Sequence, residues 1–362
     1  MAPPPFFRQT TQFLYKHWLT FAFVLGFFTD TMLLNQIDNI VDNMVLLFYA
    51  LLATVSLWLL YVGVAERAPA KLARFFRKYT PILMQYAFGG LLSGMLIFYG
   101  RSGDWLSSWP FLLLILAVIF GNELVEKRSD RLVYQVALYF IGLFSYIVLV
   151  VPVVTGKMGD GLFILSGLIA LLIVTFVVQV LYRIVPNFMI ANTRRIILTI
   201  GGIYVTFNLL YFTNLIPPIP LSLTKLEIVQ SVGKVTSGGY RIVAETQPWY
   251  VKLPFIRPII HPTGTSIACF SRVFAPTKLS TKIYNRWEYK DESGAWQERF
   301  RFGYDISGVN KNGYGGYTIL ENFSNGIWRC SVETERGQVL GRETVLIDTV
   351  TKNSYPVVTR IE

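Results

Sequence analysis

Long apolar segments dominate the first 214 residues of this chain and limit what it can fold into. The hydrocarbon core of a bilayer is ~30 Å thick, so a helix needs about 20 mostly apolar residues to cross it. We therefore expect a membrane-embedded α-helical bundle of about seven transmembrane helices. The candidate spans are residues 18–35, 44–65, 81–100, 108–125, 132–154, 161–182 and 196–214.

The first candidate span also has the length of a secretory signal peptide, and it carries Asp30. A signal peptide would be followed by a cleavage site of small residues. The chain instead continues Met32-Leu33-Leu34-Asn35. We expect the segment to be retained as a helix, with residues 1–17 as a short cytoplasmic N-terminus.

The basic residues between the spans predict an orientation. Lys and Arg favour the cytoplasmic side of a membrane protein. With the N-terminus inside, 13 Lys and Arg lie in the cytoplasmic segments and only Arg101 and Lys157 lie in the outer loops. An odd number of spans then places the C-terminal region outside the cytoplasm. We expect a multi-pass protein of the bacterial inner membrane with a periplasmic C-terminal domain.

Charge also marks a domain boundary near residue 215. Residues 1–214 hold 15 Lys and Arg with 9 Asp and Glu, and the remaining 148 residues hold 18 and 13 of the chain's 33 and 22. Prolines at positions 217, 218 and 220 cannot continue a helix. We expect a seven-helix domain over 18–214, a stiff extended connector over 215–224 and a water-soluble domain over 225–362.

This soluble domain has the alternating pattern of half-buried strands. One example is Ile283, Asn285, Trp287 and Tyr289, which alternate with more polar neighbours that include Glu288. A period of two with one apolar face is typical of a strand. Similar runs at 300–306 and 328–333 predict that the Phe302 side chain points inward and the Glu333 side chain outward. Turns that contain glycine separate the runs. The pattern favours an all-β sandwich.

Both cysteines fall in this domain, at predicted inward positions on either side of Trp287 in the sequence. The order Cys269, Trp287, Cys330 is similar to that of immunoglobulin sandwiches, where a disulfide joins the sheets beside a buried Trp. We expect an immunoglobulin-like sandwich with a Cys269–Cys330 disulfide, which an oxidising periplasm would permit. Two buried free thiols remain the alternative.

Several motifs together resemble the bacterial family known as domain of unknown function 2914. The resemblance implies an inner-membrane protein with a periplasmic β domain and brings no known activity. It also implies an aliphatic residue at position 330, so the disulfide would be a feature of this chain and not of the family. The motifs are residues 274–280 (FAPTKLS), Arg286-Trp287, 313–317 (GYGGY), 326–329 (GIWR), 332–334 (VET) and Gly341-Arg342, with 37–43 and 216–223 in the membrane portion.

Catalytic signatures are not evident in the sequence. The two histidines, His17 and His261, have no second His or Cys at metal-ligand spacing. We find no phosphate loop, dinucleotide fingerprint or nucleophile motif. We therefore expect no metal and no cofactor, and we favour a protein that is not an enzyme.

Asp30 is the clearest charge within a predicted span. A charge inside a membrane is costly unless it faces a partner or water. It would therefore either line an acidic vestibule for a cation or proton, or bond to Thr29, Thr31 or a helix amide such as Asn208. Gly90-x-x-x-Gly94 predicts close helix packing and leaves a homo-oligomer open.

The outer domain offers the stronger binding signal. Aromatic faces and arginine forks suit sugars, carboxylates or phosphates. The alternative is that the aromatics are core and the arginines a solvated face. The candidates are Arg286, Arg299, Arg301, Arg329, Trp249, Tyr314 and Tyr317.

Two functional hypotheses follow from these signals. In the first, the bundle anchors a β domain that binds an envelope glycan, lipid or partner protein. In the second, the chain is a membrane transporter or sensor that works through Asp30, with the β domain as lid or receptor. Nucleic acid is excluded as a partner, because the basic domain is predicted to face away from the cytoplasm.

Overall fold

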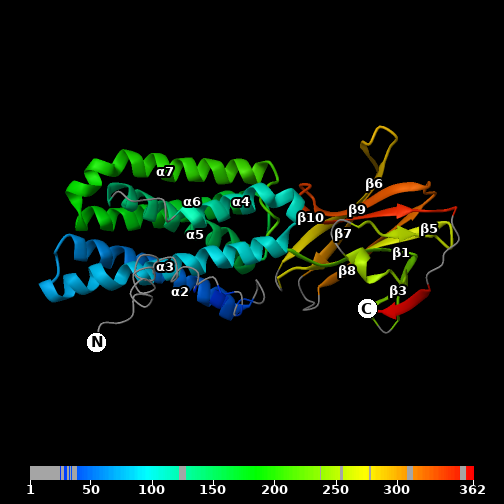
Figure 1. The fold of residues 1–362 in the computed structure, drawn as a ribbon, viewed down its shortest axis with the longest axis horizontal. Coiled ribbons are helices and arrows are strands. Elements are labelled where there is room, and N and C mark those ends of the chain that lie inside the picture. Colours follow the sequence, from blue (N-terminus) through cyan, green and yellow to red (C-terminus); the bar gives the residue numbers. More distant parts are fainter. Residues whose placement is uncertain are drawn as a thin grey trace, which may run out of the picture. The chain divides into compact units, whose positions relative to one another are not determined.

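The computed structural model describes residues 25, 28–30, 32, 34, 39–121, 128–236, 238–252, 256–276, 279–307, 313–350 and 356–362 (Figure 1). The chain forms two compact units. One comprises Met1–Gly100, Trp109–Val154 and Met158–Thr213 and is helical. The other comprises Arg101–Ser108, Thr155–Lys157 and Asn214–Glu362 and contains all the described strands.

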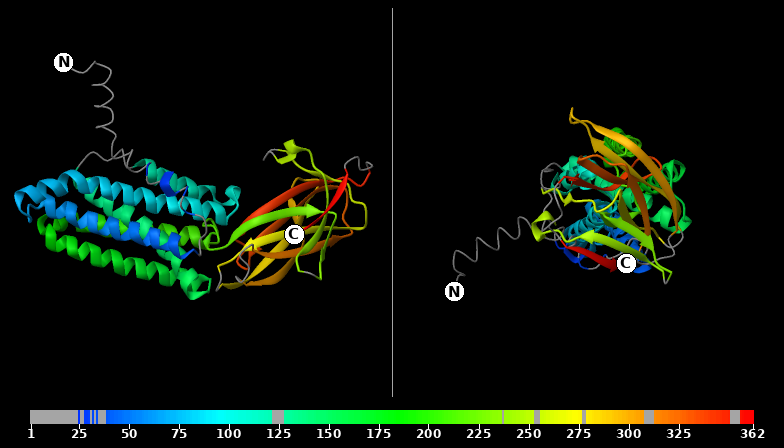
Figure 2. Two further views of the ribbon diagram at one scale, coloured as in Figure 1. Left: turned by 90° about the horizontal axis from the view of Figure 1, so that it is seen from below. Right: turned by 90° about the vertical axis from the view of Figure 1, so that its right-hand side faces the viewer.

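The helices of the first unit lie side by side along a shared direction (Figures 1 and 2). Five of the described helices, namely α2, α3, α5, α6 and α7, are long and apolar enough to cross a membrane, whereas the described apolar part of α4 is shorter. The prediction of several long apolar helices that could cross a membrane is thus confirmed. The bounds are α2 (Ile40–Val64), α3 (Ala70–Ser102), α4 (Trp105–Gly121), α5 (Arg128–Thr155), α6 (Asp160–Ile184) and α7 (Pro186–Phe212).

Two of the described helices begin ten or more residues earlier than the apolar pattern predicts. Helix α3 starts at Ala70 where the predicted span starts at 81, and α7 starts at Pro186 where the predicted span starts at 196. The added turns carry Arg and Lys, which are good helix formers. Hydrophobicity marks the part of a helix that suits lipid, and the helix itself continues beyond it. The predicted span at 18–35 lies largely outside the described residues, so the number seven stays a prediction.

Small residues bring α3 close to α2. A Cβ atom added to Gly90 would lie 2.4 Å from Cε2 of Tyr49, and one added to Gly94 would lie 2.5 Å from Cδ2 of Leu46. Only glycine permits such contact between the helices. The Gly90-x-x-x-Gly94 motif therefore serves packing within the chain.

The second unit contains three sheets. Their strand orders are β1-β5-β8, β4-β10-β9-β6-β7 and β11-β3-β2, and a β-rich C-terminal region is thus confirmed. The bounds are β1 (Ser222–Val229), β2 (Ser231–Lys234), β3 (Tyr240–Glu245), β4 (Ile259–Ile260), β5 (Ser266–Phe274), β6 (Ser280–Lys290), β7 (Trp296–Ser307), β8 (Tyr314–Glu321), β9 (Gly326–Thr334), β10 (Val339–Ile347) and β11 (Val357–Ile361).

Strand β5 lies between two hydrophobic cores. Ile267 and Cys269 join the core shared with the five-stranded sheet, which includes Trp287. Ala268 and Phe270 join a second core with Ile242 of β3. Because both faces of β5 are covered, its sequence is a nearly continuous apolar run. The third sheet was not predicted, since it pairs β3 with β11 from more than 100 residues further along the chain.

The proline-rich segment is not the extended spacer that was predicted. Ile216, Ile219 and Leu221 are buried. Gln338 Nε2 donates to the Ile216 carbonyl at 3.2 Å. Strand β1 begins directly afterwards at Ser222, three residues before the predicted start of the domain at 225. The prolines at 217, 218 and 220 are buried as well, so the segment packs as a continuous apolar stretch.

Candidate functional site

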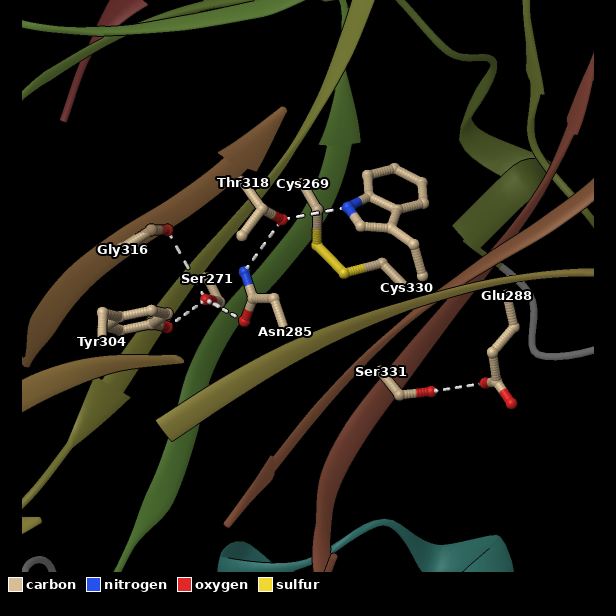
Figure 3. The surroundings of a disulfide bond; sticks show 10 residues. Cys269, Ser271, Asn285, Glu288, Tyr304, Gly316, Thr318, Cys330 and Ser331 are labelled. Carbon is tan, nitrogen blue, oxygen red and sulfur yellow. Dashed lines mark hydrogen bonds between the residues drawn. A yellow bond between two sulfur atoms is a disulfide. The ribbon is translucent and has the colours of Figure 1, made fainter. Parts of the chain in front are cut away.

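A disulfide joins the β1-β5-β8 sheet to the five-stranded sheet of the β unit. Cys269 on β5 is bonded to Cys330 on β9, and both side chains are fully buried (Figure 3). Trp287 on β6 is the cross-strand neighbour of Cys330 and is also fully buried. Its Nε1 donates to Thr318 Oγ1 at 3.0 Å. The predicted Cys, Trp, Cys order thus corresponds to one contiguous core.

Polar side chains lie beside the disulfide and satisfy one another (Figure 3). Ser271 Oγ lies 2.6 Å from Tyr304 Oη and donates to Asn285 Oδ1 at 3.2 Å. Burial raises the pKa of Tyr304 to about 12, so its hydroxyl stays protonated at neutral pH. Buried networks of this kind fix the register of facing strands when every member has a partner. We interpret this cluster as structural.

Arginines gather on the opposite face of the five-stranded sheet. Cross-strand pairing places Arg342 of β10, Ser331 of β9, Arg286 of β6 and Arg301 of β7 in one row. Adjacent strands are about 4.8 Å apart, so these side chains crowd together. Arg329 lies two residues from Ser331 and therefore on the same face. We call this surface the charged face, defined by Arg286, Arg301, Arg329, Arg342, Glu288 and Glu333.

The two glutamates of the charged face are buried, although the alternating pattern predicted them to be solvated. Their side chains are 8% exposed for Glu288 and 3% exposed for Glu333. Arg329 Nε donates to Glu288 at 2.8 Å, and Arg301 Nε donates to Glu333 at 2.6 Å. Each carboxylate therefore lies beneath an arginine that neutralises it.

Aromatic rings hold these two arginines in place. The Arg301 guanidinium carbon lies 3.9 Å from the centre of the Tyr284 ring, and that of Arg329 lies 4.0 Å from the Trp296 ring. Planar guanidinium groups stack well on aromatic faces. The stacked arginines and aromatic rings cover Glu333 and Glu288, so these outward-facing carboxylates are buried by side chains alone.

Arg286 is the least satisfied member of the charged face. Its guanidinium lies 3.5 Å from Glu333 and 3.7 Å from Glu288, beyond ordinary hydrogen-bond length. Its Nε has no hydrogen-bond partner among the described residues. The side chain is 26% exposed, so a solute can reach it.

Arg342 lies in the same row as Arg286, with Ser331 between them, and is itself paired. Asp104, which belongs to the same unit, lies 3.0 Å from its NH1. Burial is the main cause that lowers the pKa of Arg342; Asp104 opposes the shift, and the like charges of Arg329 and Arg286 add to it. The four guanidinium groups are paired with Glu288, Glu333 and Asp104, and Arg286 has the longest of these contacts. The exposed Glu298 of β7 is the cross-strand neighbour of Glu288 on the same face.

The structure brings together only three of the seven residues predicted to bind. Trp249 is 77% exposed on a short 3-10 helix (Trp249–Lys252) outside the sheet. Tyr314 and Tyr317 lie on β8 in the three-stranded sheet. Arg299 occupies a bulge in β7, where the register skips it, and it forms no ion pair within the described chain. Sequence reasoning missed Arg342, which the Gly341-Arg342 motif contained.

Asp30 is fully buried in the helical unit. Tyr49 Oη of α2 donates to its Oδ1 at 2.8 Å, and Ser93 Oγ of α3 donates to its Oδ2. Asn208, an expected partner, instead donates to the Tyr204 carbonyl of its own helix. Both oxygens of Asp30 therefore contact helix side chains.

Metal-ligand groups do not converge in the part of the chain that the structure describes. No three His, Cys, Asp or Glu side chains there are placed to hold one ion. His261 is buried, with Nδ1 3.4 Å from Glu245 Oε2 and its backbone N–H donating to Glu245 Oε1 at 2.8 Å. This pair closes the loop before β5. His17 lies outside the described residues.

Glu343 on β10 gives the β unit a pH dependence. Burial first, and then the charge of Glu227, raises the pKa of this carboxyl to about 7. Between the unfolded value of 4.5 and about 7 the folded protein binds more protons, so its stability falls as pH rises through that window. Glu343→Gln should therefore raise the free energy of unfolding, by at most ~3 kcal/mol at pH 8 and by almost nothing at pH 4.

Melting of the full chain in detergent, followed by Trp fluorescence from pH 4 to 8, measures this effect. The exposed Glu298 of β7 supplies a matched control, as Glu298→Gln should leave the wild-type slope unchanged. An equal slope in wild type and Glu343→Gln would show that Glu343 is not the titrating group.

Comparison with known proteins supports the resemblance drawn from the motifs. Residues 280–345 match the family described as "Protein of unknown function (DUF2914)". The matched segment runs from the first residue of β6 into β10 and contains the whole arginine and glutamate set of the charged face. The resemblance is therefore confirmed in this region.

The other comparisons add little. No curated protein sequence matches the chain. Among solved structures, a Pseudomonas fluorescens alkylpurine DNA glycosylase AlkC bound to DNA containing an abasic site analog shares 12% identity, over 82% of this chain and 77% of that one. Its TM-score is 0.20, which carries no argument about fold or function.

Proposed function

We propose that this chain is a non-enzymatic protein of the bacterial inner membrane whose periplasmic β domain binds an envelope glycan, lipid or partner protein. The helix bundle anchors the domain. Support comes from five helices that suit a bilayer, from the 13 to 2 bias of basic residues and from a disulfide that suits an oxidising compartment. Seven spans remain part of the proposal.

The proposed domain is an immunoglobulin-like sandwich. In that fold one sheet holds strands A, B and E, the other holds C, F and G, and a disulfide links B to F beside a Trp on C. Here β1, β5 and β8 correspond to the first set, and β6, β9 and β10 to the second. The cysteines lie on β5 and β9 and the Trp on β6. Strand β7 extends the second sheet.

One observation carries the binding proposal, namely the four arginines on adjacent strands around Arg286, whose own contacts to carboxylates are long. An arginine fork that lacks strong partners favours an oxygen-rich acidic group. The fixed charges around it are suited to holding a ligand. They do not provide an acid and a base for proton transfer, which supports a binding role over an enzymatic one.

Retention of envelope material by the full chain tests the proposal. We expect immobilised wild-type protein in mild detergent to retain a component of solubilised envelopes. Arg286→Gln should lose most of that retention, because it removes the positive charge and the guanidinium fork. Arg241→Gln, an exposed change on β3, is the matched control and should retain as much as wild type. Equal retention by all three proteins would refute the proposal.

The alternative, a transporter or sensor that works through Asp30, predicts a different result. Asp30 is enclosed by Tyr49 and Ser93, which supports a structural role. We expect Asp30→Asn to keep the retained envelope component and to lower the melting midpoint of the bundle, since it weakens two hydrogen bonds to a buried carboxylate. Unchanged stability together with a lost cellular phenotype would favour the alternative.

A further inference from the structure

We infer that the group bound at the charged face is a phosphate, held by Arg286 between the guanidinium groups of Arg301, Arg329 and Arg342. The inference rests on the proposed binding function and names the chemistry of the ligand. It follows from four arginines on four adjacent strands, of which the central one, Arg286, has only long contacts to its carboxylates.

The depths at which the arginines and glutamates lie decide whether the ligand is an anion or a cation. The carboxylates of Glu288 and Glu333 lie beneath the arginines, with side-chain exposures of 8% and 3%. The side chains of Arg286 and Arg301 are 26% and 30% exposed. An approaching solute therefore meets guanidinium groups before it meets carboxylates. Around Arg286 this arrangement favours an anion, and a neutral sugar would form no ion pair with its guanidinium.

The glutamates also fix the positions of the flanking arginines. Arg329 donates through Nε and NH2 to Glu288, both at 2.8 Å. Arg301 donates through Nε to Glu333 and through NH2 to the Thr334 carbonyl at 3.1 Å. Groups that are held in this way need little ordering when a ligand arrives. Between them, the Nε of Arg286 is buried and has no hydrogen-bond partner within the described residues, so the exposed part of its guanidinium is what a ligand meets.

The arrangement suits a phosphate better than a carboxylate. A carboxylate has two oxygens in one plane, and a single guanidinium fork satisfies it. A phosphate has additional acceptor oxygens that point in several directions. In its own row Arg286 is next to Arg301 on one side and next to Ser331, followed by Arg342, on the other, and Arg329 lies in the next row. Donors that approach from several strands match the tetrahedral group.

Calorimetric titration of the full chain with inorganic phosphate tests the inference, in a detergent without phosphate. We expect binding to wild type and to Arg241→Gln, and binding at least about tenfold weaker to Arg286→Gln, the loss of one charge-assisted bond. Arg286→Lys should also bind weakly, because an ammonium lacks the fork. The melting midpoint of each variant shows whether it is folded, and Arg286→Lys keeps the charge over the glutamates.

A second arm separates the two sources of phosphate. The chain is placed in nanodiscs of phosphatidylglycerol or of a phosphate-free glycolipid, and the titration is repeated. Loss of phosphate binding only in phosphatidylglycerol identifies a lipid headgroup, and unchanged binding in both identifies a soluble phosphate. Either result supports the inference.

Two outcomes would overturn the inference. One is acetate binding as tightly as phosphate, and the other is phosphate binding that does not depend on Arg286. If envelope retention still requires Arg286 in those cases, the proposed function stands and only the phosphate assignment fails. If retention is also independent of Arg286, both fail.

Discussion

Replacing both cysteines, Cys269→Ala with Cys330→Ala, is expected to lower the free energy of unfolding of the β domain by about 4 kcal/mol. The bond closes a loop of 61 residues and so removes many conformations from the unfolded chain. It also ties together two sheets that share one core. Denaturant unfolding of the full chain, followed by the Trp residues of the β domain, measures the loss.

Reduction of the wild-type protein provides the control for this prediction. A strong reductant should shift the unfolding midpoint of wild type toward that of the double variant and leave the double variant unchanged. Thiol labelling of freshly lysed cells under denaturing, non-reducing conditions should find both cysteines blocked in the wild type, as expected in an oxidising compartment. Fully labelled thiols, or a double variant as stable as wild type, would contradict the account.

Truncating Trp287 should have an effect of similar size. Trp287→Ala is expected to cost roughly 3–5 kcal/mol, the usual range for a large aromatic removed from a packed core. The side chain is fully buried against the disulfide, and its loss also leaves Thr318 without its indole donor. Denaturant unfolding of the full chain measures this cost.

Trp249 offers a matched control for Trp287, because it is the same residue type at 77% exposure. Trp249→Ala should change stability by no more than ~0.5 kcal/mol. Trp287→Phe should fall between the two, since it keeps most of the packing and loses the hydrogen bond. Similar costs for Trp249→Ala and Trp287→Ala would mean that the core is not built around Trp287.

Local pattern was enough to predict part of the fold. The alternation in β6 correctly placed Ile283, Asn285 and Trp287 inside, because a strand with one covered face records that face in its sequence. The same rule was wrong for Phe302, which is 55% exposed. Strand β7 is an edge strand of a five-stranded sheet that faces a three-stranded one. Which strand lies at the edge depends on the topology, and a single strand does not encode it.

The charged face was only partly predictable for a related reason. Arg286, Arg301 and Arg329 were identified as outward-facing, and this holds. Their ion pairs with Glu288 and Glu333 depend on which strands are neighbours, and the pairing of β6 with both β7 and β9 brings together residues up to about 50 positions apart. No periodicity within one strand contains that information. The aromatic candidates Trp249, Tyr314 and Tyr317 lie on other elements, which likewise depends on the topology.

The central claim is that Arg286 and its neighbours bind a component of the cell envelope. Native mass spectrometry of the full chain, extracted from its own membrane in mild detergent, tests this even while the ligand is unidentified. We predict a co-purifying adduct that contains phosphorus on the wild type and on Arg241→Gln, and its absence from Arg286→Gln. The same adducts on all three proteins, or none on any of them, would contradict the claim.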